Sequence, residues 1–334
     1  MKYWVNNNKD VLDLFKISKH GNNKYSSRAV VRFETEPGQQ AQFDFKESVK
    51  IKMIDGKEMS VYIACLLFSY SRFRLYVLMP DLTTESVIQA LAMMFEKAGC
   101  VPKEILFDNA KAIMIEARTS KNEGKVNPKL SAFAKDMGFE IKPCVARRPQ
   151  TKGKVESQMK VLDDLYAYSG DLDFDSLVKQ IEKIETRENY KFHSNYQKVP
   201  TLNLNKEKEA LPALNEELLK SYLPQNFERI IDKSGMIKYE NNNYSVDNNY
   251  INKKCNVSIF GNYLIIKYST NKFVSHLISD KIFNYSQEFY QNALSKATNL
   301  PLNDSKLKEM AKNNLNIFNQ QIIKDNTFNN KWKE

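Results

Sequence analysis

Ala41-Gln42-Phe43-Asp44-Phe45 decides the fold of this chain of 334 residues. Apolar and polar residues alternate in it, which predicts a strand with Phe43 and Phe45 on one face and Asp44 on the other. A carboxylate between two phenylalanines of a core strand costs free energy unless it is paired or bound to a metal. The stretch therefore predicts a buried strand and a functional acid together.

The segments that follow predict a layered α/β fold, with a hairpin turn at 55–56 and helices that close at Gly99 and Gly138. The expected strands are 61–69, 72–79, 105–107 and 139–144, and the expected helices are 83–98, 128–137 and a third from Gly153 onward. The order is strand, strand, strand, helix, strand, helix, strand, helix. This is the order of the ribonuclease H-like fold, an α/β fold in which helices flank a mixed five-stranded sheet.

Apolar periodicity marks the face that each expected helix buries. The residues expected on these faces are Val87, Leu91, Met94 and Phe95 in the first helix, Leu130, Phe133, Ala134 and Met137 in the second, and Val155, Met159, Leu162 and Tyr166 in the third. Glu156 lies one position off the last stripe, at the edge of the buried face.

Three acids stand out in these elements, one in the middle of a strand and two at the ends of elements. Asp44 lies in the first strand, Asp108 ends the fourth and Glu156 opens the third helix, with 63 and 47 residues between them. Strands one and four are neighbours in such a sheet, so the three carboxylates are expected to converge. Mg²⁺ and Mn²⁺ prefer carboxylate oxygens, and two such ions can drive phosphoryl transfer. Taken singly, Asp108 is as well explained as a turn residue as by metal binding. Glu156 is likewise explained as a charge that stabilises the first turn of a helix.

We predict a site for two divalent ions, in which Asp44 bridges both ions, Asp108 holds one and Glu156 the other. Water or a DNA 3′-hydroxyl would attack in line, so this chemistry needs no nucleophile from the protein.

A basic loop precedes the third acid: Arg147-Arg148-Pro149-Gln150-Thr151-Lys152-Gly153-Lys154-Val155-Glu156. Residues 141–160 hold six basic side chains and one acid, whereas residues 171–190 hold six acids and three bases. Basic side chains beside a phosphoryl-transfer site contact phosphates and add affinity with little sequence information. The predicted phosphate contacts are Arg147, Arg148, Lys152 and Lys154. A solvated basic loop is the alternative.

The composition is that of an ordinary soluble protein with a polyanionic partner. Hydrophobic residues make up 42%, charged residues 27%, the net charge is +10 and the pI is about 9.1. The longest apolar run, 61–68, is too short to span a bilayer, and the first thirty residues show no signal-peptide core. We therefore expect a cytoplasmic protein. Four scattered cysteines and three scattered histidines predict neither a disulfide framework nor a zinc site.

The rest of the chain changes character several times. An acidic helix is expected at 172–190, an extended connector with scattered prolines at 192–214, and a small antiparallel β-barrel at 236–278. The predicted domains are an N-terminal segment 1–36, a catalytic core 37–168, a helical or extended connector 169–232, a DNA-binding β-barrel 233–282 and a basic tail with helices 283–334. His193 in the connector is expected either to contact DNA or to stabilise a turn.

The three acid-bearing blocks, 33–44, 106–111 and 148–156, resemble the catalytic blocks of IstA-type insertion-sequence transposases. That family is part of the DDE integrase group, with retroviral integrases and the phage Mu transposase. His193, Val199-Pro200 and Leu211-Pro212 resemble its connector, and the strand-rich part resembles its small β-barrel. The resemblance covers about residues 31–290.

The resemblance implies a DNA transposase that cuts the 3′ ends of its element and joins them to target DNA. It also implies two Mg²⁺ or Mn²⁺ ions, an AAA+ ATPase of the IstB type as partner, and a homo-oligomer on paired element ends. The predicted DNA-binding set further includes Asn109, Lys111 and Lys160. Members of the family carry an N-terminal helix-turn-helix, whereas residues 1–30 show no such pair of helices, so a truncated copy or a catalytic fragment is expected. The alternatives are an idle DNA-binding remnant and a metal-dependent nuclease without joining activity.

Overall fold

The computed structural model describes residues 34–54, 56, 58–119, 122–144, 159–194, 196–270 and 272–329. The N-terminal segment 1–33 and the basic loop 145–158 lie outside these ranges, so the predictions made for them stay predictions.

A mixed five-stranded sheet forms the centre of the region that was predicted to be the core, residues 37–168. Its strands lie in the order β3-β2-β1-β4-β7. The first three pair antiparallel, while β4 pairs parallel with both β1 and β7. The bounds are Gln40–Lys52 for β1, Glu58–Phe68 for β2, Arg74–Met79 for β3, Glu104–Phe107 for β4 and Glu140–Pro143 for β7. This order confirms the ribonuclease H-like fold and makes β1 and β4 neighbours.

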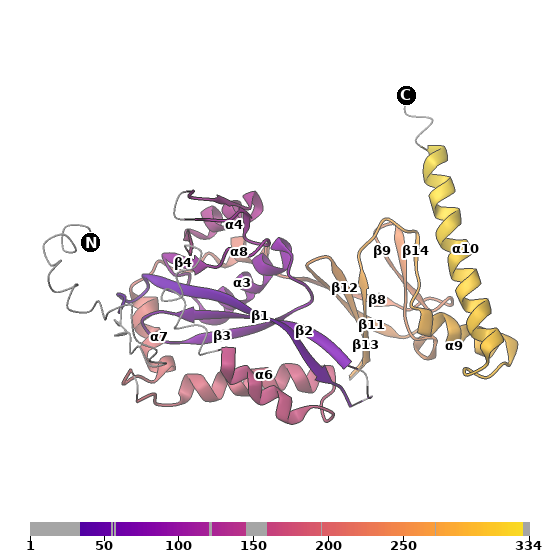
Figure 1. Ribbon diagram of the computed structural model, residues 1–334, viewed down its shortest axis with the longest axis horizontal. Coiled ribbons are helices and arrows are strands. Elements are labelled where there is room, and N and C mark those ends of the chain that lie inside the picture. The colour runs from indigo at the N-terminus through magenta and orange to yellow at the C-terminus, as the bar shows by residue number, and fades with distance from the viewer. Residues whose placement is uncertain are drawn as a thin grey trace, which may run out of the picture. The chain divides into compact units, whose positions relative to one another are not determined.

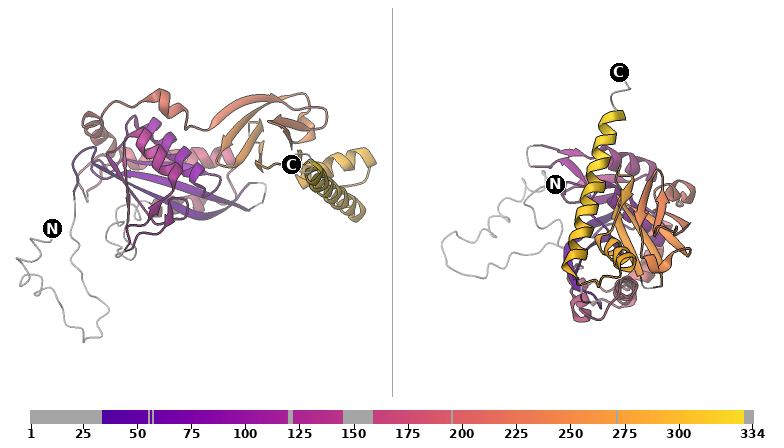
Figure 2. Two further views of the ribbon diagram at one scale, coloured as in Figure 1. Left: turned by 90° about the horizontal axis from the view of Figure 1, so that it is seen from above. Right: turned by 90° about the vertical axis from the view of Figure 1, so that its right-hand side faces the viewer.

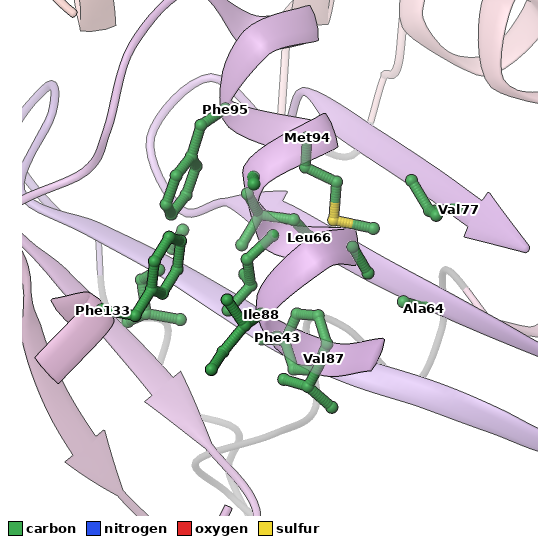
Figure 3. Close-up of a cluster of buried hydrophobic side chains, with 14 of the residues drawn as sticks. Phe43, Ala64, Leu66, Val77, Val87, Ile88, Met94, Phe95 and Phe133 are labelled. Atoms are coloured by element: carbon green, nitrogen blue, oxygen red, sulfur yellow. The ribbon is translucent and has the colours of Figure 1, made fainter. Parts of the chain in front are cut away.

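Two helices cover one face of the sheet. They are α3 (Thr84–Ala98) and α4 (Pro128–Met137), and Figure 1 shows them on the side of the sheet opposite α6 (Phe174–Tyr190). Thr83 caps α3 by accepting from the Ser86 backbone N–H, and Gly99 ends it in a left-handed conformation. The predicted apolar faces are confirmed, since their side chains meet Phe43 and Leu66 of the sheet in one core (Figure 3).

The other face is covered by α6 and by a short 3₁₀-helix, η2 (Leu162–Tyr168). The predicted core stripe is wrong at Tyr166, whose side chain is 47% exposed, while Leu162 and Leu165 are both fully buried. A 3₁₀-helix repeats every three residues, so the residue below Leu162 is Leu165 rather than Tyr166.

A β-bulge in β1 explains why this strand contributes buried side chains to the cores on both faces of the sheet. Lys46 pairs with Ile63 and Val49 with Val61, so two residues of β1 oppose one residue of β2. The extra residue reverses the alternation. Asp44 therefore shares a face with the buried side chains of Val49 and Ile51, which belong to the core under η2 and α6.

Three further elements depart from the sequence prediction. A two-stranded hairpin, β5 (Met114–Glu116) and β6 (Lys125–Val126), lies between β4 and α4. The connector contains helices, as predicted, but its part 192–214, which was expected to be extended, holds α7 (Pro200–Glu209), and α8 (Glu216–Lys220) follows. Proline at the first position of a helix needs no donor there and has the helical φ already, so Pro200 starts α7 instead of breaking it.

The β-rich region is confirmed, and its strands pair antiparallel except for β10 with β14, which pair parallel. The described strands form two sheets and close no barrel among themselves. One sheet has the order β13-β12-β11-β8 and the other β14-β10-β9. The bounds are β8 Gln225–Ile230, β9 Met236–Tyr239, β10 Asn242–Ser245, β11 Lys254–Phe260, β12 Tyr263–Ser269, β13 Lys272–Leu277 and β14 Phe283–Asn284, with a 3₁₀-helix, η3, at Asn248–Tyr250. The sheets share one apolar core that includes Tyr244, Val257 and Ile266.

Two helices follow, α9 (Gln287–Thr298) and α10 (Ser305–Asn329), and Figure 2 shows α10 as one continuous helix. The four cysteines all lie in described ranges, and none of them forms a disulfide. Within the described ranges, no helix combines the length and the apolar character that crossing a membrane requires.

Candidate active site

Asp44 lies in β1, and Asp108 directly follows the neighbouring strand β4. The parallel register of β1 and β4 pairs Gln42 with Leu106, and the same register two residues further brings Asp44 opposite Asp108. Adjacent strands lie about 4.8 Å apart. The structure therefore brings together the two aspartates that the sequence predicted to converge.

The two aspartates also point to the same side of the sheet. Phe43 and Phe107, their neighbours in sequence, face the core under α3 and α4, with ring centroids 5.5 Å apart. Side chains alternate along a strand, so Asp44 and Asp108 lie on the opposite side. That side of β2 carries Cys65, the cross-strand partner of Asp44.

Each carboxylate accepts a backbone hydrogen bond from the residue after it. The Phe45 N–H donates to Asp44 Oδ1 at 3.0 Å and the Asn109 N–H to Asp108 Oδ1 at 2.7 Å. Asp44 is half-buried, while Asp108 is exposed at the carboxyl end of β4. Burial raises the pKa of the Cys65 thiol, and the charge of Asp44 adds to the rise, so this thiol stays protonated beside the carboxylate.

Lys46 joins the Asp44 face of β1 to the segment that precedes η2. Its Nζ lies 3.3 Å from the Met159 carbonyl oxygen, forms an ion pair with Asp163 and lies 5.9 Å from the centre of the Tyr166 ring. The side chain of Lys46 is only 19% exposed. The sequence analysis missed this residue, although its spacing of two from Asp44 already placed it on the same face.

The third predicted acid, Glu156, and the four predicted phosphate contacts of the basic loop lie outside the described residues. These contacts are Arg147, Arg148, Lys152 and Lys154. Two other predicted contacts, Lys111 and Lys160, have exposed side chains. Their roles stay predictions.

The side-chain amide of Asn109 forms hydrogen bonds within the protein. Its Nδ2 donates to the Cys144 carbonyl at 2.9 Å and to the Arg118 carbonyl at 3.4 Å, and its Oδ1 accepts from the Arg118 N–H at 2.8 Å. These contacts fix the loop after β5 at the carboxyl ends of β4 and β7. The DNA contact predicted for Asn109 stays a prediction beside this observed role.

His193 stabilises a turn, one of the two roles expected for it. Its backbone N–H donates to Lys198, its ring Nε2 lies 2.8 Å from the Glu188 carbonyl oxygen, and its ring stacks on Tyr196.

The donor chemistry at the aspartate pair fits hard divalent cations. Two carboxylates at one level of adjacent strands offer the oxygen ligands that Mg²⁺ and Mn²⁺ prefer. In the described part of the chain, no group of three or more His, Cys, Asp or Glu side chains forms a metal cluster. Glu156, the third predicted ligand, lies outside these ranges.

The strand order and the paired aspartates define an α/β protein with the ribonuclease H-like fold. No family model matches the chain. The transposase of insertion sequence element IS232 from Bacillus thuringiensis subsp. berliner is 38% identical over 291 residues, which cover 87% of this chain and 67% of that protein. A transposase of an IS21-like element from Bacteroides fragilis is 27% identical over 222 residues, covering 64% of this chain and 41% of that protein. The solved catalytic core domain of BIV integrase matches 52% of this chain and 97% of its own at 15% identity, with a TM-score of 0.39.

The chain belongs to the insertion-sequence transposases of the IstA type, a family of DDE-type polynucleotidyl transferases.

Proposed function

We propose that this chain cuts the 3′ ends of an insertion sequence and joins them to target DNA, with Asp44, Asp108 and Glu156 as the metal ligands. The observation that carries the proposal is the level placement of Asp44 and Asp108 on adjacent strands, facing one side of the sheet. Two divalent ions would supply Lewis acidity at the attacking and leaving oxygens of the scissile phosphate.

The contacts of Lys46 support Glu156 as the third ligand. Lys46 shares a face of β1 with Asp44 and contacts the carbonyl of Met159, three residues after Glu156. Three residues of extended chain span at most about 10 Å. This short chain length is compatible with Glu156 as the third ligand.

The chain's own residues would orient the DNA. Arg147, Arg148, Lys152, Lys154, Lys111 and Lys160 would neutralise phosphates on either side of the scissile bond, and Asn109 would hold the loop beside Asp108. Burial on one side of Asp44 limits the directions from which DNA can approach it. We further propose assembly as a homo-oligomer on paired ends, with an AAA+ ATPase of the IstB type that presents the target.

A strand-transfer assay tests the proposal. A labelled duplex with a pre-cut element end is incubated with plasmid and Mg²⁺ or Mn²⁺, using the wild type, Asp44→Asn, and Asp280→Asn as matched control. Asp280 is exposed between β13 and β14. We expect joined product from the wild type and the control, and a loss of about 10³-fold in Asp44→Asn, because a metal ligand contributes several kcal/mol to the transition state.

The other outcomes separate the alternatives. Cleaved ends without joined product would indicate a nuclease, and DNA binding without either product would indicate an idle remnant. Unchanged activity of Asp44→Asn would refute the assignment of the metal ligands.

A further inference from the structure

Arg118 is a cation held beside the aspartate pair. The function proposed above gives this residue no role. It follows β5, in the loop that leads to β6. Its backbone N–H and carbonyl are both bonded to the Asn109 side chain, at 2.8 and 3.4 Å. Asn109 directly follows Asp108, so the loop is fixed next to the acid.

The guanidinium group of Arg118 is anchored at the carboxyl edge of the sheet. Its Nη1 donates to the Pro143 carbonyl at 2.9 Å. Pro143 pairs with Phe107 across β4 and β7, and the next residue, Cys144, donates to the Phe107 carbonyl. Phe107 directly precedes Asp108, so the guanidinium lies on the order of one or two strand spacings, about 10 Å, from that carboxylate.

Among the described residues, this anchor occupies only one of the guanidinium's donor nitrogens. Arginine carries five N–H donors in a planar fork, and only Nη1 has a hydrogen-bond acceptor among the described residues. Within the same ranges, Arg118 forms no ion pair with a carboxylate, and its side chain is half-exposed. A partly anchored arginine loses less conformational entropy on binding an anion than a free surface side chain does.

The turn that carries Arg118 is internally braced. The Thr119 N–H donates to the Asn122 carbonyl, and the Asn122 side chain accepts from the Gly124 N–H at 2.9 Å. Gly124 has a φ of +76°, and a Cβ there would lie 2.6 Å from the Glu116 carbonyl oxygen. Only glycine fits this position without a shift of the backbone.

We propose that Arg118 binds a DNA phosphate next to the scissile bond, on the Asp108 side of the site. The inference rests on the proposed function for the identity of the anion as a DNA phosphate. Arginine matches a phosphate with two parallel N–H···O bonds, which fixes the orientation of the strand as well as its affinity. Arg118 then orients the scissile phosphate, Asn109 positions Arg118, and neither residue binds the metal ions.

Salt-dependent DNA binding by the full chain tests the proposal. The affinity for a duplex carrying the element end is measured by fluorescence anisotropy over a series of salt concentrations, for the wild type, Arg118→Gln, Arg118→Lys and Lys103→Gln. Lys103 is exposed just before β4, at the opposite end of that strand, so Lys103→Gln removes the same charge elsewhere.

We expect Arg118→Gln to weaken binding about tenfold and to lower the slope of log K against log salt by about 0.9, the value for one phosphate contact. Arg118→Lys should keep the slope and lose part of the affinity, because it keeps the charge without the fork. Lys103→Gln should keep the wild-type slope, and Mn²⁺ binding should be equal in all four proteins.

Three results would overturn the proposal. Arg118→Gln could bind like Lys103→Gln and lose only thermal stability, which would make Arg118 a brace for the sheet edge. Arg118→Lys could lose the same slope as Arg118→Gln, or the wild type could show no salt-dependent binding. If Asp44→Asn keeps full activity while Arg118→Gln still lowers the slope, the catalytic assignment fails and the phosphate contact stands.

Discussion

Lys46 lies two residues after Asp44 and connects β1 to the chain beyond Glu156. Its contacts with the Met159 carbonyl and the Asp163 carboxylate span 113 and 117 residues of sequence. Partial burial strengthens an ion pair relative to one in open solvent. We propose that Lys46 positions the segment that carries the third proposed ligand.

We predict that Lys46→Met raises the Mn²⁺ concentration for half-maximal joining about fivefold, because losing a partly buried ion pair costs about 1 kcal/mol. Asp163→Asn should have a similar effect, and the double variant should add little to either, since both changes remove one interaction. Lys50→Met is the matched control, because Lys50 lies on the same strand and, among the described residues, forms its ion pair with the exposed Glu58. Equal metal dependence in Lys46→Met and Lys50→Met would contradict the positioning role.

The site residues that could be predicted from the sequence are those whose position follows from their neighbours in the chain. Asp44 was predicted because alternation places it on a face, and Asp108 because it ends a buried strand. Lys46 and Arg118 were missed, since their importance depends on the carbonyls of Met159 and Pro143, which lie far away in sequence. No periodicity encodes a hydrogen bond to a distant backbone group.

Helix α6 covers the outer edge of strand β3, which would otherwise expose unpaired backbone groups. Asn189 accepts from the Arg74 N–H at 3.0 Å and donates to the Arg74 carbonyl at 2.7 Å. One helical turn earlier, Glu185 accepts from the Tyr76 N–H at 2.7 Å. Side chains four residues apart on the helix thus pair with backbone groups two residues apart on the strand.

Glu185 makes this edge sensitive to pH. Burial raises the pKa of its carboxyl group above the ordinary value, although Lys97 and the Tyr76 N–H oppose the rise. The folded state therefore binds the proton more tightly than the unfolded state, and the contribution of Glu185 to stability is lost as pH rises through the folded pKa. Glu185→Gln stays neutral and keeps an oxygen for the Tyr76 N–H. We predict that its free energy of unfolding, relative to wild type, increases from pH 4.5 to pH 8.

Urea denaturation at several pH values measures this difference. Glu140→Gln is the matched control, because Glu140 is exposed and pairs with Lys142 at the surface. A difference between Glu185→Gln and wild type that stays constant with pH, as expected for the control, would exclude the proposed linkage.

Whether a segment forms a helix or a strand was easier to predict from the sequence than its local geometry. The apolar stripe and caps of α3 are signals within fifteen residues, so its bounds followed from sequence. The bulge at 46–49 has no such signal, since it depends on the register with β2. The 3₁₀ geometry of η2 and the helical form of α7 likewise result from packing against the sheet, which overrides the local pattern.

At the scale of the whole molecule, the order of elements was sufficient to predict the central sheet, because few arrangements satisfy the rules of chain connection. The extent of the catalytic unit did not follow from that order. Glu207 of α7 is fully buried and accepts from the backbone N–H groups of Gly38 and Ser71. Leu204 and Leu219 are buried in the core under α3 and α4.

Tyr222, which follows α8, also packs against the region that contains the central sheet. Its ring packs edge-on against Phe133 of α4, with centroids 4.7 Å apart. Its hydroxyl donates to Asp136, and this hydrogen bond is the main reason that the pKa of Tyr222 rises to about 12. Residues 200–223 therefore complete the core of the catalytic region instead of linking it loosely to the β-rich region.

We predict that a fragment 35–223 is more stable than a fragment 35–192 by about 5 kcal/mol or more. The shorter fragment exposes the apolar surface that Leu204 and Leu219 cover, about 1.5–3 kcal/mol for each side chain. It also loses the hydrogen bonds that Glu207 accepts from the N–H groups of Gly38 and Ser71, at about 1.5 kcal/mol each. These losses are a large part of the total stability of a domain.

Urea unfolding followed by circular dichroism measures the difference in stability between the two fragments, and Glu207→Leu in the longer fragment isolates the contribution of the carboxylate. Equal stability of the two fragments would instead favour a catalytic core that ends near residue 168, with 169–232 as a separable connector.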